Sequence, residues 1–71
     1  MLSEQIADAV ARRRTALGLT QVDLAELAGV SERFVRALEK GKPTVQLNLV
    51  EAVLTTLGLS LTITPRKRVG Q

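Results

Sequence analysis

The chain has 71 residues, enough for one domain and close to the lower limit at which a single hydrophobic core keeps a protein folded. It contains no Cys and no His, which excludes disulfides and thiolate metal sites and removes the commonest general base, so we expect no enzyme activity, metal or cofactor. Because 45% of the residues are hydrophobic and no covalent link is available, we expect the chain to complete its core as a homodimer.

The net charge of +3 comes from the carboxy-terminal end. Basic and acidic side chains balance over residues 1–65, and Arg66, Lys67 and Arg68 supply the excess. Residues 65–71 are therefore expected to be a basic, flexible tail, either solvated or in contact with nucleic acid. The first ten residues contain no basic residue and no apolar run is long enough to span a membrane, so we expect a cytoplasmic protein without a membrane partner.

The first predicted helix runs from about Ser3, as its N-cap, to Leu17, and Gly18 ends it. Its apolar stripe contains Ile6, Val10 and Leu17. Arg14 lies at the edge of this stripe and needs an acidic partner, because an unpaired charge is costly to bury.

The second and third predicted helices are short and follow each other closely. Residues 20–23, Thr-Gln-Val-Asp, are close to a capping box, so a helix is expected to start after Thr20 and to end at Gly29. The next helix is expected to run from about Glu32 to Lys40, behind Ser31 as N-cap, with Gly41 as its end. The residues expected to point inward are Leu24, Ala25, Ala28, Val35 and Leu38.

A fourth helix is predicted to begin near Gln46 or Asn48, after the turn at residues 41–43, and to end at Gly58. The apolar residues of this helix are expected to complete the core. They are Leu47, Val50, Val53, Leu54 and Leu57.

Residues 59–64 alternate between apolar and polar side chains, and half of them are β-branched, which predicts a strand that ends at Pro65. A single strand cannot satisfy its own backbone hydrogen bonds, and the chain has no second strand pattern. The simplest partner is the same strand of a second copy, paired antiparallel across a two-fold axis through Leu59, Leu61 and Ile63. Alternatively, these three residues dock on the fourth helix as an extended tail.

The pair of short helices around Gly29 is a helix-turn-helix arrangement. Ala25 is small where the two helices cross, Gly29 is expected to need a positive φ, and Val30 is expected to fill the core beneath the turn. Helical hairpins in bundles share parts of this pattern.

Residues 14–41 resemble the phage repressor/Cro-type (XRE) helix-turn-helix family. Thr-Gln at 20–21, Leu-Ala at 24–25, Ala-Gly-Val-Ser at 28–31 and Glu-Lys-Gly at 39–41 all fall at the family's spacings. The resemblance implies an all-α, four-helix, lambda-repressor-like DNA-binding domain over residues 1–58. The segment 59–64 is similar to the strand through which HipB-type antitoxins dimerise, which implies a carboxy-terminal β-strand pairing across a homodimer.

The resemblance also implies roles for single positions. Major-groove base contacts are implied for Ser31, Glu32, Arg33 and Arg36. An Arg can contact guanine O6 and N7, and Glu32 can accept a hydrogen bond from cytosine N4. Ala37, where relatives often carry a polar residue, is too short to read a base. The alternative is a charged helix face that is only solvated.

Phosphate contacts are implied for Thr20, Gln21, Lys40 and Lys42. Arg14 and Glu39 match a structural ion pair between the first and third helices of relatives. Phe34 either packs between the third and fourth helices or touches a thymine methyl group. Leu27 is expected to be exposed, which is a hint of a protein partner.

The function implied is a sequence-specific transcriptional repressor that binds double-stranded operator DNA as a homodimer and is associated with the nucleoid. The likeness to HipB-type antitoxins further implies an antitoxin that neutralises a HipA-like kinase toxin and autoregulates their operon. The alternatives are a solitary repressor and a protein-interaction module that does not use DNA.

Overall fold

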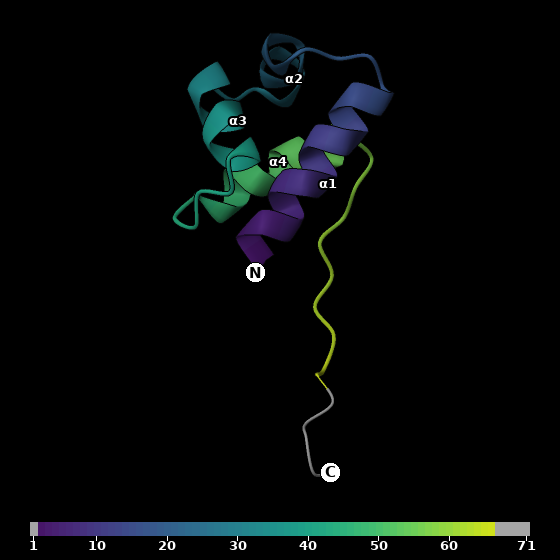
Figure 1. The fold of residues 1–71 in the computed structure, drawn as a ribbon, viewed down its shortest axis with the longest axis vertical. Coiled ribbons are helices and arrows are strands. Elements are labelled where there is room, and N and C mark those ends of the chain that lie inside the picture. Colours follow the sequence, from purple (N-terminus) through teal and green to yellow (C-terminus); the bar gives the residue numbers. More distant parts are fainter. Residues whose placement is uncertain (1, 67–71) are drawn as a thin grey trace.

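The computed structural model describes residues 2–66, and this part of the chain folds into four helices (Figure 1). The predicted number and order of helices are confirmed. The tail residues Lys67 and Arg68 lie outside the described range. No helix between residues 2 and 66 combines the length and apolarity that crossing a membrane requires. The helices are α1 (Leu2–Ala16), α2 (Gln21–Ala28), α3 (Glu32–Glu39) and α4 (Leu47–Thr56).

All four helices contribute to one apolar core. α2 packs against both α3 and α4, and α1 packs against α3. Partly buried side chains, among them Ile6, Ala28 and Val30, pack around the centre as predicted. The buried centre consists of Val10, Leu24, Ala25, Val35, Leu38, Val50, Val53, Leu54 and Leu57.

Two residues predicted to be in the core are exposed. Leu17 lies beyond the end of α1 at Ala16, where the chain reverses, and Leu19 packs against the core in its place. Leu47 is the first residue of α4 and lies at the rim of the bundle. Both predictions were wrong for the same reason: each residue lies at a helix end, and helical periodicity does not show where a helix ends or where its apolar face stops being buried.

The helix starts agree with the sequence at α2 and α3 and differ at α1. The Thr20 hydroxyl accepts a hydrogen bond from the Asp23 N–H (3.0 Å), and the Asp23 carboxylate accepts one from the Thr20 N–H (2.9 Å), which completes the capping box. The bond from the Thr20 N–H stabilises the ionised carboxylate and, with a smaller contribution from the Thr20 hydroxyl, lowers the pKa of Asp23. The Ser31 hydroxyl caps α3. Ser3 is not an N-cap, because α1 already includes Leu2.

Gly29 sets the angle between α2 and α3. Its backbone is left-handed (φ 73°, ψ 32°), and its N–H donates to the Ala25 carbonyl. A Cβ atom added at this position would meet no atom within 4 Å. The backbone conformation, rather than a lack of space, therefore favours glycine at this turn.

Replacing Thr20 with Ala is expected to lower the free energy of unfolding by about 1 kcal/mol, because the Asp23 N–H loses its acceptor at the start of α2. Urea denaturation followed by circular dichroism measures the change. Thr15→Ala is the matched control: the Thr15 hydroxyl only bonds back to the Ala11 carbonyl on an exposed face of α1, so its loss should leave stability unchanged or slightly higher. Equal effects of the two changes would contradict the capping role.

The predicted strand at 59–64 is absent from the described part of the chain. The Leu59 N–H donates to the Leu54 carbonyl (2.8 Å), and its side chain packs against the core. Residues 60–66 then leave the helices as an exposed, extended segment without a backbone hydrogen bond to any other described residue (Figure 1). A strand requires a hydrogen-bonded neighbour, and residues 2–66 of a single chain supply none.

Candidate nucleic-acid interface

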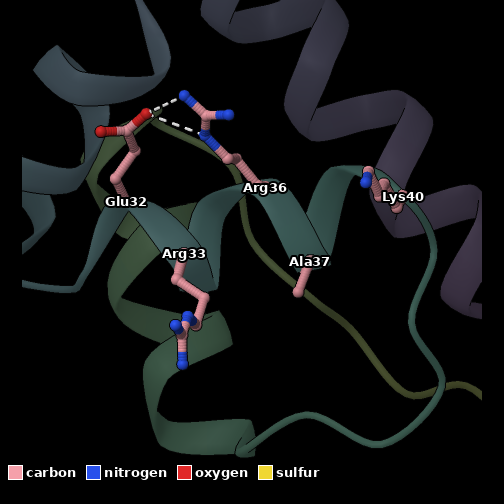
Figure 2. Close-up of a pocket in the computed structure, with 5 residues that line it drawn as sticks. All are labelled: Glu32, Arg33, Arg36, Ala37 and Lys40. Carbon is pink, nitrogen blue, oxygen red and sulfur yellow. Dashed lines mark hydrogen bonds and ion pairs between the residues drawn. The ribbon is translucent and has the colours of Figure 1, made fainter.

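The outward face of α3 carries several charged side chains, opposite the face that packs in the core. Val35 and Leu38 anchor the helix in the core on one side. On the opposite side, charged and small side chains line a shallow concave surface (Figure 2). The residues that line it are Glu32, Arg33, Arg36, Ala37 and Lys40.

Three of the four predicted base-contacting residues carry a charge, and they differ in whether that charge already has a partner in the protein. Arg36 donates from Nε to the Glu32 carboxylate (2.8 Å) and forms a second bond to it from Nη2. Arg33 is exposed, extends away from this pair in Figure 2, and has no hydrogen bond or ion pair with a described residue. Arg33 therefore presents a free guanidinium, whereas the charge of Arg36 is neutralised by Glu32.

The fourth predicted base-contacting residue, Ser31, lies at the start of α3, where its hydroxyl already accepts from the Phe34 N–H (3.0 Å). Phe34 is half-buried and packs against the core, so the packing alternative is the one observed. Ser31 and Arg33 also line a second shallow surface, between α3 and the loop before α4.

Lys42, predicted to contact phosphate, is exposed on this second surface, together with Thr44 and Gln46. Gln46 is the N-cap residue of α4 but makes no capping hydrogen bond with its side chain. The sequence marks this loop only as a polar turn that precedes a helix, which does not indicate that its residues face the same side as Arg33.

The remaining predicted phosphate contacts lie at the ends of α2 and α3. Thr20 is exposed at the start of α2, and Lys40 is exposed at the end of α3. Gln21 is half-buried, and its Nε2 donates to the Glu39 carboxylate (3.1 Å). Its side chain is thus held toward the protein rather than extended into solvent.

A largely buried ion pair connects α1 to α3. Arg14 donates from Nε (2.7 Å) and Nη2 (3.1 Å) to the two carboxylate oxygens of Glu39, and from Nη1 to the Leu19 carbonyl (2.9 Å). The Arg14 side chain is 19% exposed and that of Glu39 is 8% exposed. The hydrogen bond to Glu39 raises the pKa of Arg14, against the opposing effect of burial. With the bond from Gln21, this group fixes α3 relative to both preceding helices.

The two other arginines of α1 have local partners. Arg12 pairs with Asp8 one turn earlier on an exposed face (2.9 Å). Arg13 donates from Nε to the Leu57 carbonyl (2.8 Å) and so satisfies a backbone acceptor at the end of α4.

Comparisons with known proteins agree with this architecture. A family model described as helix-turn-helix matches residues 10–63, which include all of α2, α3 and α4. A protein of Sinorhizobium fredii named as an uncharacterized HTH-type transcriptional regulator, y4mF, is 50% identical over 50 residues, or 70% of this chain and 66% of that protein. The chain thus spans slightly less than two thirds of this relative's length.

A second relative, from Methanothermobacter thermautotrophicus, is also named as an uncharacterized HTH-type transcriptional regulator. It is 41% identical over 49 residues, which cover 69% of this chain and 71% of that protein. The match to the family model covers more than half of the chain and includes both helices around Gly29. The chain belongs to the helix-turn-helix family of the phage repressor/Cro (XRE) type.

Proposed function

We propose that the protein is a sequence-specific DNA-binding transcriptional repressor that acts as a homodimer. The observation that carries the proposal is the difference between the two faces of α3. Its inner face is held by Val35, Leu38 and the Arg14–Glu39 pair, and its outer face presents Arg33, free of any described partner. The names of the two relatives as transcriptional regulators support the same function.

In this proposal α3 lies in the major groove of duplex DNA. The Arg33 guanidinium donates two parallel hydrogen bonds to guanine O6 and N7, and Glu32 and Arg36 contact neighbouring bases. Ser31 contacts the base at the start of the helix. These groups select the sequence, because the pattern of donors and acceptors in the major groove differs for each base pair.

The phosphate backbone is contacted from three places around α3 in the proposed complex. The start of α2 supplies Thr20 and Gln21. One N–H of the Gln21 amide bonds to Glu39, and the other remains available to a phosphate. Lys40 and Lys42 contribute from the end of α3 and the loop that follows it. Such contacts fix orientation and register without reading sequence.

Dimerisation is proposed through residues 59–64. An antiparallel pair of these segments centred on Leu61 would place Ile63 opposite Leu59 of the partner subunit. Ile63 is 96% exposed in the single chain, and Leu61 is 40% exposed. In the pair, Leu59, Leu61 and Ile63 share one face of each strand, and the proposed ladder supplies the hydrogen bonds that residues 60–66 lack.

The dimer would place two α3 helices about 34 Å apart, one turn of duplex DNA. Occupation of a promoter at this spacing excludes RNA polymerase. A gel shift on the DNA directly upstream of the protein's own gene tests the proposal. We expect a sequence-specific complex, and the absence of any complex at low salt, where phosphate contacts are strongest, would refute it.

We further propose that the repressor is an antitoxin that binds a HipA-like kinase and autoregulates their operon. Its support is the exposed side chain of Leu27 on α2, which is available to a protein partner, and the resemblance of segment 59–64 to the HipB-type strand. The test is co-purification with a HipA-like kinase encoded beside the gene. Repression without such a partner would indicate a solitary repressor.

Replacing Arg33 with Ala is expected to weaken operator binding by about 10- to 100-fold and to relax discrimination at one base pair, since a bidentate contact to guanine is lost. Fluorescence anisotropy with a labelled operator measures the affinity. Arg12→Ala removes an exposed arginine from α1 and serves as the control, with little expected change in affinity. Unaltered binding by a folded Arg33→Ala dimer would favour an interaction module that does not use α3 for DNA.

A further inference from the structure

We infer that Glu32 is a selectivity residue: it keeps Arg36 from contacting a guanine unless a cytosine is present to donate a hydrogen bond to Glu32 in place of Arg36. The inference rests on the proposed function and deepens it, because it assigns a base preference and a coupled mechanism to two residues of α3. The structural observation behind it is the pairing of Glu32 with Arg36 on the outward face of the helix (Figure 2).

The Glu32–Arg36 pair lies on the surface of α3 that faces DNA in the proposed complex. Glu32 is the one acidic residue among the five that line the α3 surface, which also includes Arg33, Arg36 and Lys40. The Glu32 side chain is 37% exposed and that of Arg36 is 61% exposed, so the core does not require the pair. An exposed pair one turn apart on a helix shifts an equilibrium only about twofold, and it can therefore open for a better partner.

The base that Glu32 faces decides whether the pair opens. Glu32 can only accept hydrogen bonds when ionised, and guanine N7 and O6 and thymine O4 are also acceptors. Adenine offers an N6–H donor, but its N7 acceptor lies beside that donor and repels the second carboxylate oxygen. Against these atoms the carboxylate keeps its bonds to Arg36, because an unpaired carboxylate in a dehydrated interface is costly. The Nε edge of Arg36 is then occupied and its charge is neutralised, so Arg36 no longer offers that edge to guanine and the surface loses one cation.

Cytosine changes this balance, because its N4 amino group donates a hydrogen bond in the major groove. Glu32 then transfers to cytosine, and Arg36 is free to donate to guanine O6 and N7. The two residues are four positions apart, about 6 Å along the helix. Since base pairs are spaced about 3.4 Å apart, the cytosine and the guanine must lie within about two base-pair steps.

The test uses the full chain with Glu32→Gln, which removes the charge and keeps the size of the side chain. Dissociation constants are measured by fluorescence anisotropy for the operator and for a duplex of unrelated sequence, over a series of salt concentrations. We expect the variant to bind the unrelated duplex about 3- to 10-fold more tightly and to lose about tenfold in the ratio of operator to unrelated binding. The dependence of log Kd on log salt should steepen by about one, because Arg36 becomes free to contact a phosphate.

Asp8→Asn is the matched control. Asp8 and Arg12 form an exposed pair with the same four-residue spacing on α1, so this change adds the same charge and also releases an arginine. It is expected to leave the ratio of operator to unrelated binding unchanged. A wild-type ratio in Glu32→Gln, or an equal loss in both variants, would overturn the inference.

Selection of binding sites from random duplexes gives a second readout. The wild type should select a cytosine and a guanine within two steps, and Glu32→Gln should replace that cytosine preference with adenine, whose N6 and N7 match the amide. An unaltered preference at this position would also overturn the inference. Failure of the wild type to bind any duplex would instead refute the proposed function, and the two failures are therefore distinguishable.

Discussion

Replacing Glu39 with Ala is expected to lower the free energy of unfolding by about 3 kcal/mol. The change leaves the Arg14 guanidinium, 19% exposed, without its carboxylate and also deprives Gln21 of an acceptor. Removing one partner of a buried ion pair costs roughly 3–5 kcal/mol, and partial solvation of Arg14 favours the lower end. A domain of this size is stable by only about 4–10 kcal/mol, so urea denaturation should show a much lower midpoint.

Two further variants separate the ion pair from the other effects of the change. Asp8→Asn breaks an exposed pair and should alter stability by no more than about 0.5 kcal/mol. The double change Arg14→Met with Glu39→Leu removes both charges, and it should recover at least half of the loss, because neither charge is left buried alone. A double variant less stable than Glu39→Ala would contradict the view that the stranded guanidinium causes the loss.

The features of the fold that depend on local chemistry could be predicted from the sequence. The capping box of Thr20 and Asp23, the cap at Ser31 and the left-handed turn at Gly29 each involve residues within four positions of one another. The exposure of Leu17 and Leu47 could not be predicted, because it depends on how far neighbouring elements extend over the ends of α1 and α4.

The same distinction, between features set by nearby residues and features set by packing of distant ones, applies to the candidate site. The outward position of Arg33 follows from the helical period of α3, since Val35 and Leu38 fix the inward face. The bond from Gln21 to Glu39 joins residues 18 positions apart and depends on the packing of α2 against α3. The Glu32–Arg36 pair has the spacing of a helical ion pair, yet the same spacing also fits two independent base contacts. The side-chain conformations show that the two residues pair with each other.

Replacing Leu61 with Glu and Ile63 with Asp in one chain is expected to convert the protein to a monomer and to weaken operator binding by about 100- to 10,000-fold. In a dimer, binding of one α3 holds the second close to its half-site, and this gain of effective concentration is lost when the subunits separate. Like charges on paired strands would oppose the ladder centred on Leu61. Analytical ultracentrifugation measures the mass, and fluorescence anisotropy measures the affinity.

The free energy of unfolding of the separated chain should change little at these two positions, because Ile63 is 96% exposed and neither residue belongs to the buried core. This distinguishes a lost interface from a lost fold. Leu27→Asp introduces a charge at another exposed leucine and should leave both the mass and the operator affinity unchanged. A wild type that is monomeric at about 100 μM, or a doubly substituted chain that still dimerises, would show that residues 59–64 do not hold the two copies together. Tight operator binding by a monomer would require that a single α3, with its flanking phosphate contacts, supplies the affinity on its own.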